Sequence, residues 1–221
     1  MLKLDHAKRR VRVCLRAEPL LHILSHREDL FNKETASPQE SSLQLKSSWK
    51  PEFCAFQIES SPGVPYLDNL ASFNSVEHNM RQRRLEVHPL LEQDEILVAT
   101  SAFPMLGTPD FTWPPTRPEP HSERCFTKSL FWPSNTVYLG HPRYSRIATN
   151  IRQRKGEKVA INVPIYRDFK TPDPFVEDFS GLGDDGTAAR EAKPDHVYMD
   201  ATAFGMGLCC LQVTFQAECL E

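Results

Sequence analysis

Proline is the residue that most constrains how this chain can fold. The 221 residues include 18 prolines, whereas average usage near 5% would give roughly 11. Because proline lacks a backbone N–H and fixes φ, it interrupts long helices and central strands. Many of the prolines lie between residues 104 and 133. The sequence therefore predicts a long irregular connection there, and short strands joined by fixed turns elsewhere.

Hydrophobic periodicity predicts several short strands and few helices. Alternation over residues 1–17 is typical of a β-hairpin. Apolar residues at helical spacing predict helices, which we place at 19–31, 74–93 and 143–154. We expect further strands at 51–58, 96–102, 159–166, 197–200 and 210–215. This order predicts an α+β fold with a largely antiparallel sheet, because no regular βαβ alternation is present.

Polar or glycine-rich segments separate these elements. Residues 32–48 are rich in Ser and Gln and predict a polar loop or disordered arm. Residues 60–63 and 205–207 predict turns, and the acidic, glycine-rich residues 179–191 predict an exposed loop.

Composition excludes several classes of protein. A formal net charge of -3 gives no general attraction to nucleic acid or anionic membranes. No apolar run reaches the 18 or so residues of a membrane span, and the first residues do not resemble a secretory signal. The six cysteines form no C-x-x-C pair. We expect reduced thiols in a cytoplasmic protein.

Two glutamates flank the segment PEFCAFQI and are candidate ligands for magnesium. Glu52 and Glu59 could supply the charged oxygens that hard cations prefer. Their spacing of seven would send them to opposite faces of a regular strand. They converge only if the strand is interrupted. From the residues alone, solvated surface carboxylates remain the simpler interpretation.

Two basic clusters are candidate anion sites. Arg81, Arg83 and Arg84 lie on the strongest predicted helix, where arginine could grip a carboxylate or phosphate. A solvated helix face with pairs such as Glu77–Arg81 is the alternative. The second cluster spans 152–158 and lacks the spacing of a P-loop. It leaves open a generic nucleotide-binding domain.

Two further groups invite a site but have simpler explanations. Asp195, His196 and Asp200 have no second His or Cys at ligand spacing, which argues against zinc. Cys209 and Cys210 are adjacent, with no local histidine to support a thiolate, and are expected to be buried strand residues.

Several long motifs together resemble the eukaryotic glutamate–cysteine ligase catalytic subunit. They run in order along the chain as WKPEF with IESSPGVPY, FNSVEHNMRQRR, FPMLGTPDFT, KSLFWPS, HPRYSRIATNIRQRKGEKVAINVPI and KPDHVYMDATAFGMGLCCLQVTFQA, with DHAKRRVRV as a looser match. The resemblance extends from about Leu2 to Ala217, with its weakest part in the polar arm.

The resemblance implies a glutamine-synthetase-like fold, a curved and mainly antiparallel sheet forming a funnel. It implies ATP-dependent formation of γ-glutamylcysteine from glutamate and cysteine, the first step of glutathione synthesis. Magnesium ions would neutralise charge during phosphoryl transfer. Animal members of the family also pair with a modifier subunit.

The resemblance also implies residue roles. Glu52 and Glu59 match two magnesium-binding glutamates, and Gln212 matches a glutamine near the metals. Met206 and Cys210 match the segment lining the substrate pocket. Arg83 lies in a motif with a functionally sensitive arginine. Glu52 and Glu59 should then be separated by a departure from regular strand geometry.

The chain differs from the family pattern at both ends. The family has a preceding G-D-E-x-E-Y strand with two further metal-binding glutamates, and a following half with an R-x-E-F-R-P motif. We therefore expect residues 1–221 to be a partial catalytic domain that is inactive alone and exposes apolar edges. The alternative is a non-catalytic product that binds the modifier subunit.

Overall fold

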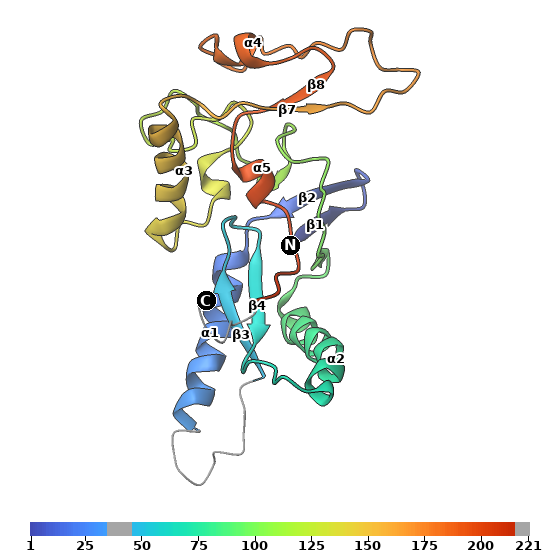
Figure 1. The fold of residues 1–221 in the computed structure, drawn as a ribbon, viewed down its shortest axis with the longest axis vertical. Coiled ribbons are helices and arrows are strands. Elements are labelled where there is room, and N and C mark those ends of the chain that lie inside the picture. The colour runs from blue at the N-terminus through green and yellow to red at the C-terminus, as the bar shows by residue number, and fades with distance from the viewer. Residues whose placement is uncertain (35–45, 215–221) are drawn as a thin grey trace, which may run out of the picture.

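The computed structural model describes residues 1–34 and 46–214. It has an α+β architecture in which small sheets and separate helices alternate (Figure 1). Within the described residues, no helix is long and apolar enough to cross a membrane.

The first sheet confirms the predicted N-terminal hairpin. Strands β1 (Leu2–Asp5) and β2 (Arg10–Cys14) pair antiparallel, β5 (Glu95–Ile96) adds to β1, and β6 (Thr112–Trp113) adds parallel to β2. Of the strand predicted at 96–102, only Ile96 is therefore paired in this sheet. The rest of that segment bonds elsewhere, since the Leu97 carbonyl accepts from the Arg84 side chain and the Thr100 carbonyl accepts from the Cys209 amide.

The second sheet is the two-stranded ribbon of β3 (Ser47–Pro51) and β4 (Ile58–Pro62). The strand predicted at 51–58 is wrong, because 52–57 is the connection between these strands. Its aromatic residues misled the prediction, since Phe53 and Phe56 are buried core residues held in a loop. The turn predicted at 60–63 is also wrong, because β4 runs through Pro62.

Two long helices lie on opposite sides of this ribbon (Figure 1). Helix α1 (Ala17–Glu34) buries Leu20, Leu21 and Leu24 and packs on β3. Helix α2 (Leu70–Val87) begins where the Asn69 side chain accepts from the Ser72 amide, and it continues into the 3-10 turn η1 (His88–Leu90). Both predicted helices are confirmed, although α1 and β3 shorten the polar arm predicted at 32–48. Residues 35–45 lie outside the described part of the chain.

The last third carries a second ribbon and three helices. Helix α3 (Pro142–Lys155) ends at Gly156, whose φ of 76° is the left-handed conformation that glycine adopts without strain. Strands β7 (Ile161–Pro164) and β8 (His196–Met199) confirm the strands predicted at 159–166 and 197–200, and the two pair antiparallel. Helix α4 (Thr187–Glu191) replaces part of the predicted loop, because the Asp184 carboxylate accepts from the Ala188 and Ala189 amides. Helix α5 (Ala203–Met206) replaces the turn predicted at 205–207.

The strand predicted at 210–215 is wrong for its described part. Residues 210–214 have no regular structure, and residue 215 lies outside the described residues. The described residues also form three small sheets, whereas one continuous sheet was expected. The mixed α+β class and the antiparallel ribbons agree with the prediction.

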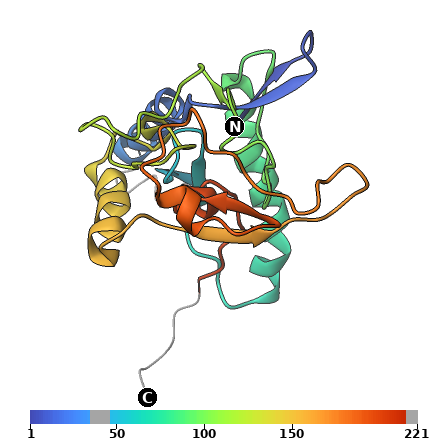
Figure 2. The ribbon, with the colours of Figure 1, turned by 90° about the horizontal axis from the view of Figure 1, so that it is seen from above.

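An aromatic cluster around Trp132 joins the distant parts of the chain. The long 104–133 connection, confirmed apart from β6 and short turns, delivers this fully buried ring. The Trp132 ring lies 5.4 Å from Phe111 and 5.2 Å from Phe204, measured between centroids. Seen from above, α5 lies between α2 and α3 (Figure 2). The core therefore fixes the C-terminal segment against the β3–β4 loop.

Candidate functional site

The two candidate metal-binding glutamates lie at the same end of the β3–β4 ribbon. Glu52 is the first residue after β3, and Glu59 is the second residue of β4, opposite Lys50. The loop at 52–57 lets two carboxylates seven positions apart approach one another. The expected departure from regular strand geometry is confirmed.

The two carboxylates interact electrostatically. Burial raises the pKa of Glu52, and the nearby charge of Glu59 raises it further. The Phe53 amide and the Arg143 guanidinium oppose this shift. Glu52 is half-buried and Glu59 is exposed. Repulsion between two like charges is relieved by a shared cation, so the pair is suited to bind a divalent metal.

Backbone hydrogen bonds from two distant segments, one at Ala17 and one at 136–138, hold the loop that joins the two glutamates. The Ala55 amide donates to the Thr136 carbonyl at 2.8 Å, and the Tyr138 amide donates to the Phe53 carbonyl at 2.9 Å. The Ala55 carbonyl accepts from the Ala17 amide at 3.0 Å. These bonds pair backbone groups of the loop that have no partner across the ribbon, and they stabilise its irregular conformation.

The side chain of Gln57 connects this loop to the C-terminal segment. Gln57 is buried; its Oε1 accepts from the Cys54 amide at 3.1 Å, and its Nε2 donates to the Leu208 carbonyl at 3.0 Å. Leu208 lies between Met206, the last residue of α5, and the exposed residues Cys210 and Gln212. The expected substrate-lining segment therefore begins beside the glutamate loop.

The structure brings the predicted residues together only in part. Met206 is partly exposed at the end of α5, and Cys210 is exposed instead of buried in a strand. No hydrogen bond joins the side chains of Cys210 or Gln212 to either glutamate within the described residues. In residues 1–34 and 46–214, no group of three or more His, Cys, Asp and Glu side chains could hold a metal ion. Among the predicted ligands, the two carboxylates that the described residues bring together are those of Glu52 and Glu59.

Arg83 contacts the strand that carries Glu59. It is buried on α2, and its Nη1 donates to both the carbonyl and the hydroxyl of Ser60, the latter at 3.1 Å. Its Nε is buried without a hydrogen-bond partner. Arg83 is thus held against β4. Arg81 instead forms an exposed ion pair with Glu77, which is the alternative that the sequence predicted for this helix face.

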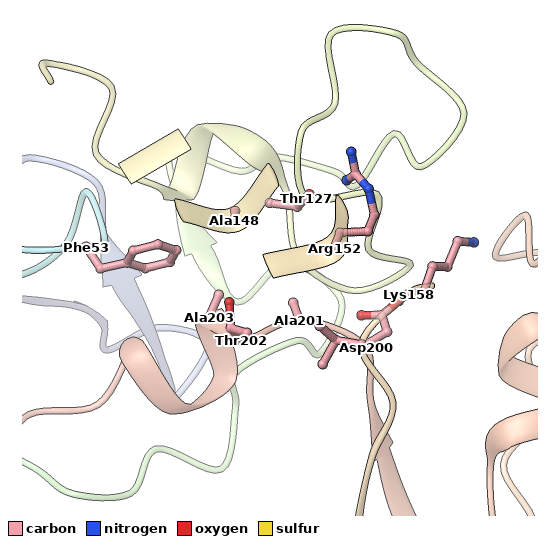
Figure 3. A pocket seen from close by; sticks show the side chains of 10 residues that line it. Phe53, Thr127, Ala148, Arg152, Lys158, Asp200, Ala201, Thr202 and Ala203 are labelled. Atoms are coloured by element: carbon pink, nitrogen blue, oxygen red, sulfur yellow. The ribbon is translucent and has the colours of Figure 1, made fainter. Parts of the chain in front are cut away.

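Two side chains of the basic cluster at 152–158 make contacts within the protein. The cluster lies at the C-terminal end of α3, where the helix dipole favours cations and disfavours anions. Arg152 donates to the Phe126 carbonyl at 2.6 Å, and Lys158 pairs with Asp185 at 2.8 Å. Their charged ends diverge in Figure 3. The cavity that they help to line measures about 20 Å³, room for about one water molecule.

The remaining candidates have structural roles. The Asp195 carboxylate accepts from the Phe175 amide at 2.9 Å and pairs with Arg167. His196 bonds the Pro194 carbonyl through Nδ1 at 2.7 Å. Burial raises the pKa of Asp200, although hydrogen bonds from Ser129 and the Leu130 amide partly offset this. All five described cysteines are free thiols, as expected.

Sequence reasoning missed two residues that shape the loop. Tyr144 donates from its hydroxyl to the Pro51 carbonyl at 2.6 Å, and Gln57 closes the loop as described above. Tyr144 lies in the conspicuous motif HPRY, but a tyrosine early in a predicted helix gives no sign of which backbone carbonyl it meets. Gln57 lies in the segment predicted as a strand, where alternate side chains point to opposite faces and nothing would distinguish Gln57 from its neighbours.

Known proteins resemble this chain along its whole length. The family model described as "Glutamate-cysteine ligase" matches residues 1–221. The human glutamate–cysteine ligase catalytic subunit is 45% identical over 217 residues, which cover 98% of this chain and 32% of that protein. The Schizosaccharomyces pombe glutamate–cysteine ligase is 38% identical, covering 83% of this chain and 28% of its own length. The Saccharomyces cerevisiae enzyme is 35% identical over 188 residues.

The chain spans about a third of the length of these relatives. The family match covers every residue, including both glutamates of the β3–β4 loop and the segment after α5. On this match, the chain belongs to the glutamate–cysteine ligase family.

Proposed function

We propose that this chain forms one wall of the active site of a glutamate–cysteine ligase. The reaction joins the γ-carboxylate of glutamate to the amine of cysteine at the expense of ATP. The observation that carries the proposal is the approach of Glu52 and Glu59 at one end of the β3–β4 ribbon in a member of this family.

Glu52 and Glu59 would hold Mg²⁺, with Gln212 as a third oxygen donor. When bound, Mg²⁺ neutralises charge on the phosphates during transfer to the γ-carboxylate. The half-buried position of Glu52 supports this role, because a partly desolvated carboxylate attracts a cation more strongly than an exposed one. Met206 and Cys210 would line the substrate pocket, and the amine of cysteine would then displace phosphate.

Arg83 would act on the site through β4. Its guanidinium reaches Ser60, the neighbour of Glu59, so it would order the carboxylate without touching substrate. The three small sheets would join a larger curved sheet of the glutamine-synthetase type in a protein of the relatives' full length. A cytoplasmic location completes this proposal.

Metal binding tests the proposal directly. Mn²⁺, which accepts the same oxygen ligands as Mg²⁺, should broaden the backbone NMR signals of residues 50–60 at millimolar concentration. Glu52→Gln and Glu59→Gln should each weaken this effect, whereas Glu77→Gln, an exposed glutamate of α2, should not. Equal broadening in all variants would overturn the assignment of the two glutamates.

Activity tests how much of the site these 221 residues supply. The chain spans about a third of its relatives, and two neighbouring carboxylates position a metal poorly. We expect no ATP-dependent formation of γ-glutamylcysteine from the purified chain supplied with Mg²⁺, glutamate and cysteine. Product formation that needs both amino acids would refute this expectation.

A second candidate function is binding to a partner subunit. The human, rat and mouse relatives are named catalytic subunits, a name that implies a further subunit in those proteins. This chain would then bind the modifier subunit without catalysing the reaction. Capture of the purified modifier subunit by the tagged chain would support this function, and its failure at micromolar concentrations of both proteins would count against it.

A further inference from the structure

Helix α2 touches the glutamate-bearing ribbon through two charged side chains one turn apart. Most of α2 is exposed, and only Arg83 and Val87 are buried along it. Arg83 reaches β4, as described above. Glu86, three residues later, reaches β3 on the other strand of the same ribbon.

Glu86 accepts two hydrogen bonds from β3. Its Oε2 accepts from the Ser47 hydroxyl and from the Trp49 indole Nε1, the latter at 3.3 Å. The Trp49 indole also donates to the Ser47 hydroxyl at 3.2 Å, so the three groups form one closed cluster. Trp49 and Ser47 are buried and Glu86 is partly buried, and hydrogen bonds to a charged group are stronger than those between neutral groups.

The two contacts meet at a single rung of the ribbon. Trp49 and Ser60 are direct partners in the β3–β4 register. Glu86 therefore holds one member of this pair, and Arg83 holds the other. The next rung toward the loop pairs Lys50 with Glu59.

The ribbon needs such a restraint because its sequence specifies register weakly. Strand β4 reads Ile-Glu-Ser-Ser-Pro, with one large apolar residue and no apolar face. A two-stranded ribbon is marginal by itself, and polar strands are prone to slip. A slip of one residue would turn Glu59 to the opposite face, away from Glu52.

We infer that Glu86 is a positioning residue of the candidate metal site, acting with Arg83 as a clamp on the Trp49–Ser60 rung. The clamp fixes the register of β3 and β4 and thereby keeps Glu59 on the side of Glu52. This inference rests on the proposed function, in which these two glutamates bind Mg²⁺.

The test compares Glu86→Ala with Glu77→Ala in the 221-residue chain. Both variants remove a glutamate from α2, but Glu77 is exposed and pairs with Arg81 on the same helix instead of with the ribbon. Two measurements are made on each: amide hydrogen exchange at Lys50 and Glu59, and the concentration of Mn²⁺ that half-broadens the signals of residues 50–60.

We expect Glu86→Ala to speed exchange at the Lys50–Glu59 rung and to raise the half-broadening concentration, each about tenfold, the size typical of losing a charged hydrogen bond. Glu86→Gln keeps an acceptor oxygen and should restore most of both values. Glu77→Ala should match the unmodified chain. A folded Glu86→Ala chain with unchanged exchange and unchanged Mn²⁺ response would overturn the inference.

Two controls keep the result interpretable. If Glu86→Ala does not fold, Ser47→Ala removes one of the same hydrogen bonds from the strand side and should shift both values in the same direction; no shift would overturn the inference. If the unmodified chain shows no Mn²⁺ broadening, the proposed function fails before any Glu86 variant is compared. A failure of the clamp instead appears as Mn²⁺ binding that Glu52→Gln weakens and Glu86→Ala leaves unchanged.

Discussion

The Tyr144 hydroxyl donates a 2.6 Å hydrogen bond to the carbonyl of Pro51, the residue immediately before Glu52. The Tyr144 ring also lies edge-on to Phe53, with 6.2 Å between centroids. One side chain of α3 thus holds both neighbours of Glu52, although 93 positions separate Tyr144 from Pro51.

Tyr144→Phe removes the hydrogen bond and keeps the ring. We expect the free energy of unfolding to fall by about 1 kcal/mol, the usual net contribution of such a bond. Urea unfolding followed by circular dichroism measures this. Tyr66→Phe is the control, because the Tyr66 hydroxyl bonds Asn79 in the solvent and its loss should cost less than about 0.5 kcal/mol. Equal costs for the two variants would contradict the anchoring role.

A buried carboxylate predicts how stability depends on pH. Burial by itself would raise the pKa of Glu95, but hydrogen bonds from the Glu92 amide, Arg16 and Cys14 outweigh it and lower the pKa below the usual 4.5. The ionised form is favoured in the folded state, so this contribution is present above pH 4.5 and is lost as the pH falls through the lowered pKa.

Glu95→Gln should therefore reduce stability by about 1.5–3 kcal/mol at pH 7, and by progressively less below pH 4.5. Urea unfolding at several pH values measures both effects. Glu92→Gln, which changes a more exposed partner of Arg16, should cost roughly 0.2–1 kcal/mol. A Glu95→Gln deficit that stays constant down to pH 3 would contradict the assignment.

Two glycines at the C-terminal end of α5 should respond in opposite ways to alanine. A Cβ at Gly207 would lie 2.8 Å from the Ala203 carbonyl oxygen and 2.9 Å from the Trp132 ring, whereas a Cβ at Gly205 meets nothing within 4 Å. We expect Gly207→Ala to destabilise the fold by about 1–3 kcal/mol. Gly205→Ala, in α5, should stabilise it by about 0.4–1 kcal/mol. Thermal unfolding compares them, and the same sign for both would be inconsistent with this packing.

Gln57→Leu tests the link between the glutamate loop and the segment after α5. The change replaces the buried polar amide with an apolar side chain of similar size, and it leaves the Cys54 amide and the Leu208 carbonyl without this partner. We expect a loss of about 1–3 kcal/mol in stability and faster amide exchange at Cys54. Gln153→Leu, at an exposed position of α3, is the matched control and should change neither.

Local sequence patterns predicted the helices and strands that are specified by their own residues. The N-terminal hairpin, the helices around 19–31 and 143–154 and the separate strands β7 and β8 carry their own periodicity, caps or turns. The pairing of β7 with β8 was not predicted, because it joins distant residues. Prediction failed at 51–58, where the aromatic residues that suggested a strand are core anchors of a loop. Nothing local could reveal this, because the bonds that hold the loop come from residues near 17, 136 and 208.

In the candidate site, too, local motifs were predictable and contacts between distant segments were not. The family motifs pointed to Glu52 and Glu59 as candidates, and together with their odd spacing they predicted the interruption that the structure shows between β3 and β4. The residues that support them were not predicted, because Tyr144, Gln57 and Glu86 act through contacts between segments distant in sequence. Arg83 was identified by its motif, but its contact with Ser60 required the structure.

The hydrogen bond between Gln57 and Leu208 spans 151 positions of the chain. It can therefore form only late in the synthesis of the chain. A ribosome releases both glutamates of the loop long before it releases α5. Contacts this far apart close late, since the intervening chain must first be confined. A nascent chain that stops before residue 208 therefore carries the two carboxylates without their C-terminal anchor, and the geometry of the site is among the last features of this chain to form.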